Sequence, residues 1–210
     1  MFRHSGYFAH FLTYTSKKSD LLSPFHGRYG GGGDQGGGGT IEDVVIRGGR
    51  IGMRASGSQW TMRSVHITGA SDAGLVLAHG GTWAFAFLDL QVSHTPVAVR
   101  MERNQATLFV DCSFQEISGP AAIIMDPNSQ IYLERVTQTG AAELLSQTGA
   151  SGVHLAALPA TQSFYSGRAF SRGAARPSHG LIPVPSWRRR TPLRPRPTYD
   201  DAAVRDVVMW

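Results

Sequence analysis

The sequence predicts an all-β protein, namely a right-handed, single-stranded parallel β-helix of about five coils with disordered flanks. Five short runs of alternating apolar and polar residues recur along the chain, and the spacings between their central residues are 21, 23, 22 and 23 positions. The central residues are Val44, Val65, Leu88, Val110 and Leu133. A fixed period of this size indicates stacked copies of one supersecondary unit. We therefore expect these five residues to form one buried column.

Each coil also contains a second short apolar run, and turn-forming residues separate it from the first. These second runs are residues 51–53, 74–77, 97–99 and 121–125. They are short and rich in β-branched residues, which favours strands over helices. A leucine-rich repeat has a similar period, but its leucine signature is missing, whereas a β-sandwich stays open as an alternative. The regular period favours the solenoid.

Composition divides the chain into four segments. We expect an irregular, glycine-rich segment over 1–37, the β-helix over 38–158, a basic Pro/Arg-rich linker over 159–197, and the start of a second β-helix over 198–210. Nine of the thirteen residues from 27 to 39 are glycine, which is too flexible for regular structure without support. We expect 1–37 and 159–197 to be poorly ordered.

Charge and cysteine content narrow the classes of function. The net charge is +5, but residues 41–150 carry seven arginines and ten acids, so the basic excess belongs to the arginine-rich tail. The tail has no nucleic-acid recognition motif, so nucleic acid is not an expected partner. No stretch predicts a membrane span or a signal peptide. Cys112 is the single cysteine, and the histidines have no metal-ligand spacing, so we expect neither a metal nor a cofactor.

Three acids are candidates for catalytic residues. Asp89, Asp111 and Glu134 recur with the period of the coils, so they could form a ladder on one outer face. Two carboxyl groups at the right separation can hydrolyse a glycosidic bond, and such a row can also bind a cation such as Ca²⁺. The simpler interpretation is that the three acids are solvent-facing residues between buried ones.

Two tryptophans are candidates for substrate binding. Trp60 and Trp83 are separated by one period of the repeat, which predicts that they stack on adjacent coils. An exposed pair would form a platform for the apolar face of a sugar ring. A buried pair would instead be an aromatic ladder in the core.

The coils resemble the pectate-lyase-like β-helix superfamily, and most closely glycoside hydrolase family 55, the exo-β-1,3-glucanases. The resemblance is carried by residues 38–46, 48–52, 59–67, 83–85, 88–90 and 108–114. Residues 196–199 and 204–207 are similar to the entry of that family's second β-helix. The resemblance implies an extracellular, polysaccharide-degrading protein with β-glucan as its partner. Members of that family place their cleft between two tandem β-helices, with the essential acid in the second.

The same resemblance leaves the activity of this chain open, because we expect only the truncated start of the second β-helix, over 198–210. It implies a fragment of a glucan 1,3-β-glucosidase-like protein that is inactive alone. The alternatives are a non-catalytic β-helix module that binds polysaccharide or a protein partner, and a degenerate gene product without independent function.

Overall fold

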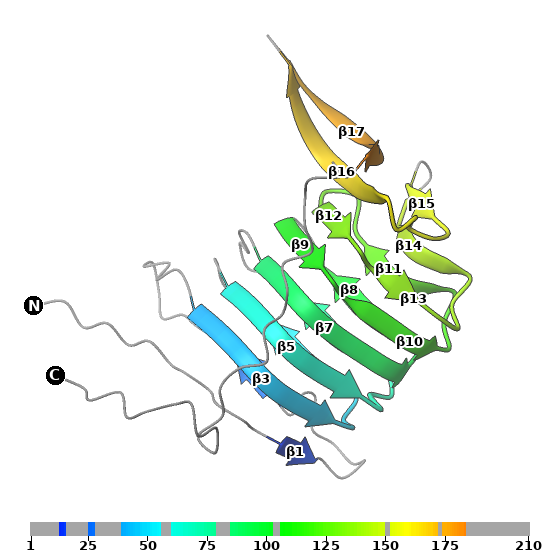
Figure 1. Ribbon diagram of the computed structural model, residues 1–210. Coiled ribbons are helices and arrows are strands. Elements are labelled where there is room, and N and C mark those ends of the chain that lie inside the picture. Colours follow the sequence, from blue (N-terminus) through cyan, green and yellow to red (C-terminus); the bar gives the residue numbers. More distant parts are fainter. Residues whose placement is uncertain are drawn as a thin grey trace, which may run out of the picture.

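The computed structural model describes residues 13–15, 25–27, 39–55, 60–78, 85–102, 106–149, 152–171 and 174–183. Every regular element in these ranges is a β-strand, and the strands stack as a parallel β-solenoid of about four turns (Figure 1). This confirms the predicted fold class. Trp83 lies outside the described residues, as do residues 184–210.

The strands form two sheets, which we call sheet A and sheet B. Sheet A contains β1 (Thr13–Thr15), β3 (Gly39–Arg47), β5 (Trp60–Thr68), β7 (Phe85–Thr95), β9 (Ala106–Val110), β10 (Ser113–Ile117), β12 (Gln130–Glu134), β13 (Thr137–Gln138), β16 (Gln162–Ser171) and β17 (Ala174–Pro183). Sheet B contains β2 (Phe25–Gly27), β4 (Ile51–Ala55), β6 (Ala73–Leu77), β8 (Val97–Met101), β11 (Ala121–Met125), β14 (Glu143–Gln147) and β15 (His154–Leu155). From β1 to β12 and from β2 to β14, successive coils pair in parallel, as predicted.

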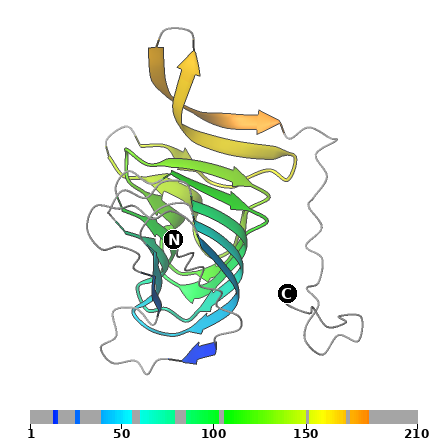
Figure 2. The same cartoon turned by 90° about the vertical axis from the view of Figure 1, so that its left-hand side faces the viewer.

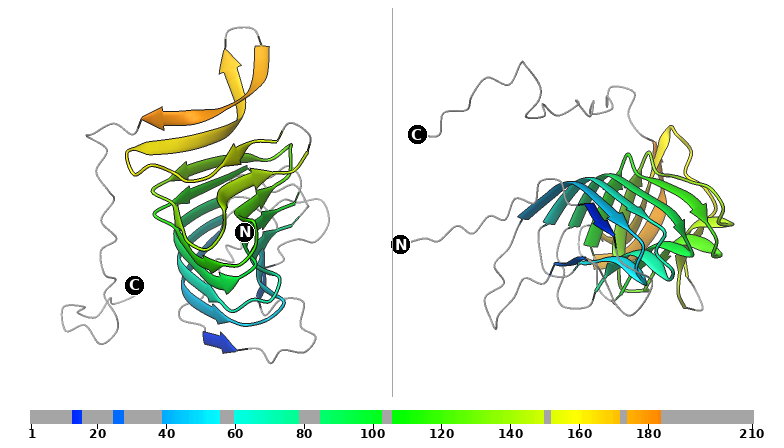
Figure 3. Two further views of the ribbon diagram at one scale, coloured as in Figure 1. Left: turned by 90° about the vertical axis from the view of Figure 1, so that its right-hand side faces the viewer. Right: turned by 90° about the horizontal axis from the view of Figure 1, so that it is seen from below.

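The core lies between the two sheets (Figures 2 and 3), and the expected column through it is wrong at its centre. Val44 pairs with Val65 as predicted, but Val65 pairs with Leu90 and not with Leu88, because the offset between β5 and β7 is longer than the spacing of the apolar runs. Leu88 and Val110 are half-buried on the outer side. The register instead gives a buried column of Val44, Val65, Leu90, Cys112 and Val136.

A second column, parallel to the first, contains Leu133. Its members are Ile41, Met62, Phe87, Phe109 and Leu133. The rings of Phe87 and Phe109 stack with centroids 4.9 Å apart, a spacing that matches the separation of adjacent strands. Sheet B approaches this core closely at Gly74, where a Cβ atom would lie 2.3 Å from a methyl carbon of Val92. The apolar run at 74–77 therefore needs a glycine at this point.

A bend in sheet A explains the error in the column. Five residues, one per coil, have left-handed backbone angles between 49° and 56°, and they are Asp43, Ser64, Asp89, Asp111 and Arg135. Such a residue turns the strand, so that it and its predecessor both face outward while the residues on either side are buried. In β7, for example, Phe87 and Leu90 are buried, whereas Leu88 and Asp89 are not. We call this row of five the bend row.

A second row of left-handed residues closes the other corner of each coil. Its members are Gly48, Gly69, His94, Glu116 and Gly140. Glycine adopts this conformation without strain, which accounts for three of the five positions. From each coil to the next, the two rows advance along the sequence by the same number of positions, so the corners follow the register of the strands.

The C-terminal flank differs from the expected linker. Within 159–197, residues 162–171 and 174–183 form the hairpin β16–β17, whose first strand pairs with β12 in antiparallel fashion. The hairpin extends beyond the last coil (Figure 2). In sheet B the last strand, β15, is also antiparallel to its neighbour β14. The region 1–37, expected to be irregular, contains the short strands β1 and β2.

Candidate functional site

Two of the three candidate acids lie in the bend row. Asp89 and Asp111 occupy it on adjacent coils, because Leu88 and Val110, which precede them, are register partners. Glu134 lies outside it, since its register partner is Val110, and Arg135 takes the position in the bend row. The structure thus brings the three acids to one corner of sheet A, although they do not form the single ladder that their spacing predicts.

The carboxylate of Asp89 is held by two neutral donors. The hydroxyl of Ser64, its neighbour in the bend row, donates a hydrogen bond to one oxygen at 3.2 Å. The side-chain amide of Gln91 donates to the other oxygen at 3.1 Å. Both oxygens therefore have partners from the outer side of sheet A. Short polar side chains such as Asp and Ser suit left-handed positions, because they can bond locally in this way.

The carboxylate of Asp111 is held by a guanidinium group. Arg135 donates to both oxygens of Asp111, with Nε–Oδ1 and Nη2–Oδ2 distances of 2.6 Å and 3.0 Å. This bidentate pair raises the pKa of Arg135 above its ordinary value, chiefly through the hydrogen bonds to Asp111. The pair also offsets the cost of placing a large side chain in left-handed backbone. Both oxygens of Asp111 are thus engaged by one cation.

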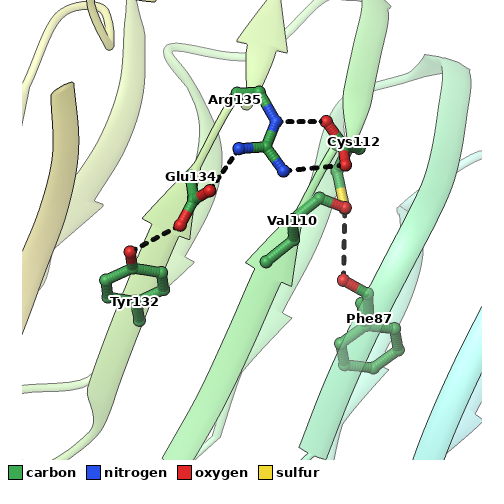
Figure 4. A network of polar contacts seen from close by, with 7 residues as sticks. Phe87, Val110, Cys112, Tyr132, Glu134 and Arg135 are labelled. Atoms are coloured by element: carbon green, nitrogen blue, oxygen red, sulfur yellow. Dashed lines mark hydrogen bonds and ion pairs between the residues drawn. The ribbon is translucent and has the colours of Figure 1, made fainter. Parts of the chain in front are cut away.

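Glu134 is buried although it lies on the outer side of its strand. The side chain is 4% exposed, and Arg135 donates to its Oε1 atom. The hydroxyl of Tyr132 donates to Oε2 at 2.7 Å. Figure 4 shows that Tyr132, Glu134 and Arg135 form one continuous chain of polar contacts. A buried carboxylate needs such partners, because an unpaired charge in this position would be strongly destabilising.

Cys112 lies directly beneath this chain of contacts but faces the core. Its thiol is fully buried and contacts the backbone oxygens of Phe87 and Val110 at 3.6 Å and 3.3 Å (Figure 4). Burial raises the pKa of Cys112 to about 12. The thiolate is the nucleophilic form, so this cysteine stays protonated and unreactive at neutral pH.

The structure describes the position of Trp60 but not that of Trp83. Trp60 is half-buried and packs against the core at the start of β5. Thr61, which follows it, pairs with Ala86, so the residue level with Trp60 on the next coil is Phe85 and not Trp83. The offset between these strands is thus longer than the spacing of the tryptophans. The expected stacking of Trp60 on Trp83 stays a prediction, since Trp83 lies outside the described residues.

The outer side of sheet A carries half-buried apolar and aromatic residues that the sequence did not predict to face outward. We call these residues the outer patch: Leu88, Leu108, Val110, Tyr132 and Tyr165. Leu108, Tyr132 and Tyr165 are register partners on three successive strands, and Leu88 pairs with Val110 on the next row. Leu88 and Val110 each come directly before an acid of the bend row. This position is the sequence feature that could have identified them as outward-facing.

The outer side of sheet B carries ion pairs beside apolar residues such as Val76 and Ile124. Asp72 contacts both Arg50 and Arg100, at 2.9 Å and 2.7 Å, and Arg54 contacts Glu102 at 3.0 Å. The hydrogen bond from Arg100, together with both positive charges, lowers the pKa of Asp72. The pairs of Asp72 link adjacent coils, whereas the pair between Arg54 and Glu102 spans two coils. Each of these carboxylates therefore has an arginine partner.

A serine, a histidine and a glutamate also meet at the end of sheet B. The Nδ1 atom of His154 lies 3.3 Å from the hydroxyl of Ser146 and 2.9 Å from the carboxylate of Glu143. In a hydrolytic triad the serine and the acid occupy opposite ring nitrogens, so that the imidazole can pass a proton between them. Both groups here share one nitrogen, so this cluster is not a nucleophilic site.

The comparisons with known proteins give no identity. No protein-family model and no curated protein matches this chain. The part of the chain that the structure describes contains no helix long and apolar enough to cross a membrane. The same residues contain no group of three or more side chains that could hold a metal ion. The fold and the outer side of sheet A therefore define the class of protein as a parallel β-solenoid with an amphipathic lateral face.

Proposed function

We propose that this chain is a non-catalytic β-solenoid module that binds polysaccharide on the outer patch of sheet A. The observation that carries the proposal is the position of the patch beside the bend row. Apolar and aromatic side chains there lie next to fixed amide, hydroxyl and carboxylate groups. Carbohydrate sites combine these two features, because a sugar ring has an apolar face and a rim of hydroxyl groups.

The fixed geometry of Tyr132 supports the proposal. Its hydroxyl is bonded to Glu134, and Glu134 is bonded in turn to Arg135, so the phenol ring is held in one orientation on the outer side of sheet A. A ring that is already ordered loses little conformational entropy when a ligand packs on it. Asp89 and Gln91, at the edge of the patch, can exchange hydrogen bonds with hydroxyl groups of a sugar.

The engagement of the candidate acids argues against hydrolysis by this chain. A glycosidase needs one carboxyl group that donates a proton and a second that activates water or attacks the sugar. Both oxygens of Asp111 and both oxygens of Glu134 are occupied by Arg135 or Tyr132. Each of these four oxygens would have to leave its present partner before it could bind a sugar or a water molecule.

The expected ligand class comes from the resemblance to the exo-β-1,3-glucanases. On that basis β-1,3-glucan is the first polysaccharide to test, and an extracellular location follows as part of the same proposal. The residues of the outer patch do not themselves distinguish one glucan linkage from another. Laminarin is therefore the probe, with a β-1,4-linked oligosaccharide as the comparison ligand.

The experiment measures laminarin binding by calorimetry together with the release of reducing sugar. Replacing Tyr132 by alanine should weaken binding about tenfold, which corresponds to about 1.4 kcal/mol. Tyr132→Phe keeps the ring and should bind better than Tyr132→Ala. Ile124→Ala, a change on the outer side of sheet B, is the matched control and should leave the affinity unchanged.

Three results would contradict the proposal. The first is the absence of saturable binding to either polysaccharide by the wild-type chain. The second is equal affinity in the wild type and Tyr132→Ala. The third is sugar release well above background that disappears in Asp111→Asn or Glu134→Gln, because it would show that the engaged acids are catalytic.

A further inference from the structure

The two ends of the solenoid differ in the direction of their last strands. At the N-terminal end, β1 and β2 pair in parallel with β3 and β4, as every coil in the stack does. At the C-terminal end, β16 and β15 pair in antiparallel fashion with β12 and β14. Among the described strands, the parallel repeat is therefore broken at the C-terminal end.

Without the antiparallel strands, the two ends of the coil stack would be complementary. A solenoid repeats by translation, so every coil pairs with the next coil through the same edge. The last coil would offer this same edge with no further coil to pair with it. Ile41 and Leu133 occupy opposite ends of one core column. The β12 edge of one molecule would thus match the first coil of another, and a head-to-tail contact of this kind does not close on itself.

The hairpin occupies this edge. Phe164 in β16 pairs with Leu133 and is 3% exposed, so it fills the next position of the core column. The hydroxyl of Ser163 bonds to the backbone oxygen of Ile182, which ties β16 to β17 beside the same edge. The backbone donors and acceptors of β12 that a further parallel coil would use are paired with β16 instead.

The outer strand of the hairpin is a poor template for another chain. Among the described strands β17 ends the order of sheet A, and it contains Pro177 and Pro183. A proline within an antiparallel pair is tolerated where its nitrogen faces away from the partner strand, so these two prolines remove donors from the open edge. Leu181 and Ile182, which are 44% and 48% exposed, lie on this blunted strand.

We propose that the hairpin β16–β17 is a cap that prevents end-to-end self-association, and that the partner it excludes is a second copy of this chain. The proposal is independent of polysaccharide binding, because it concerns the end of the stack and not the outer patch. It assigns a role to a segment whose Pro- and Arg-rich composition predicts only a linker.

The test uses the full-length chain with two different changes that weaken the joint between β16 and β12. Phe164→Ser removes the ring from the core column, and Ser166→Pro removes the backbone donor that β16 directs toward its partner Ile131 in β12. Leu181→Ser is the matched control, because Leu181 pairs with Phe164 on the side away from β12. Sedimentation across a concentration series measures the molar mass, and far-ultraviolet circular dichroism checks that the strands persist.

The two joint variants should form elongated assemblies that grow with concentration and diffract at about 4.8 Å along their axis. The wild type and Leu181→Ser should stay monomeric. If one joint variant unfolds, the molar mass of the other joint variant tests the proposal. A joint variant that keeps its strands and remains monomeric overturns the proposal. So does association of the wild type or the control, and so does unfolding of both joint variants, because the hairpin would then be part of the core and not a separable cap.

Discussion

Sheets A and B enclose one core, but their outer sides differ. The parallel strands of sheet B from β4 to β14 are uniformly short, and several of them are tied together by arginine–carboxylate pairs. Sheet A bends once in each coil at a left-handed residue, and beside the bend it carries the outer patch. The bend turns two consecutive residues of each coil to the outer side, so sheet A can vary its surface chemistry without disturbing the core. The proposed binding uses the outer patch of sheet A, whereas the ion pairs on sheet B hold coils together.

The largest effect should come from the core of sheet A. Phe87 is fully buried and stacks on Phe109, so Phe87→Ala should lower the free energy of unfolding by about 3–5 kcal/mol. Its neighbour Leu88 faces outward at the bend, and Leu88→Ala should cost less than about 1 kcal/mol. Urea unfolding of both variants measures the difference. An equal or larger cost for Leu88→Ala would show that the bend is misplaced.

The contrast between Phe87 and Leu88 shows where sequence reasoning succeeds and where it fails. The period predicted the parallel stack and the pairing of Val44 with Val65. Strict alternation through each strand would place Leu88 and Val110 in the core, but the bends at Asp89 and Asp111 interrupt that alternation. A left-handed Asp has no distinct sequence signature here, since an Asp that faces outward from a regular strand gives the same apolar–polar pattern as an Asp at a bend.

The candidate site was predictable to a similar extent. Spacing brought Asp89 and Asp111 to adjacent coils, but it could not show that Arg135 would occupy the next bend position and bind Asp111. The sequence does not predict the hairpin β16–β17 either, for a related reason. Residues 162–183 are rich in Ser, Gly, Pro and Arg, and they become strands because β12 offers them an edge, which is tertiary information.

The next largest effect should follow the removal of Arg135. Its side chain is 13% exposed and that of Glu134 is 4% exposed, so Arg135→Ala leaves two acids without their shared cation in a largely dry corner. We expect a loss of about 3 kcal/mol in the free energy of unfolding. Arg135→Lys keeps the charge but loses the bidentate geometry, so its cost should be smaller. Denaturant titration checks both, and a neutral Arg135→Ala would show that the ion pairs at the bend are not structural.

The ion pairs of sheet B predict a pH dependence. The folded-state pKa of Asp72 lies below its ordinary value of 3.8, so its stabilising contribution is complete above that value and is lost as the pH falls through the folded pKa. Asp72→Asn should be less stable than the wild type at neutral pH. The difference between the two melting temperatures should shrink on acidification below about pH 4. A difference that is constant with pH would contradict the assigned ion pairs.

The smallest effect should come from Cys112. It occupies a column whose other members are Val44, Val65, Leu90 and Val136, so Cys112→Val should change the free energy of unfolding by less than about 1 kcal/mol. The native thiol should not react with a disulfide reagent at neutral pH and should react fully once the chain is unfolded. Rapid reaction of the native protein would contradict the burial of this column.

The most direct test of the division between the sheets is methyl nuclear magnetic resonance during a titration with laminarin. We predict saturable shifts of the methyl signals of Leu88, Leu108 and Val110 on the outer side of sheet A. The signals of Val76 and Ile124 in sheet B should not move. Shifts confined to the methyl groups of sheet B, or no shifts at any methyl group at saturating laminarin, would contradict the assignment of binding to the outer patch.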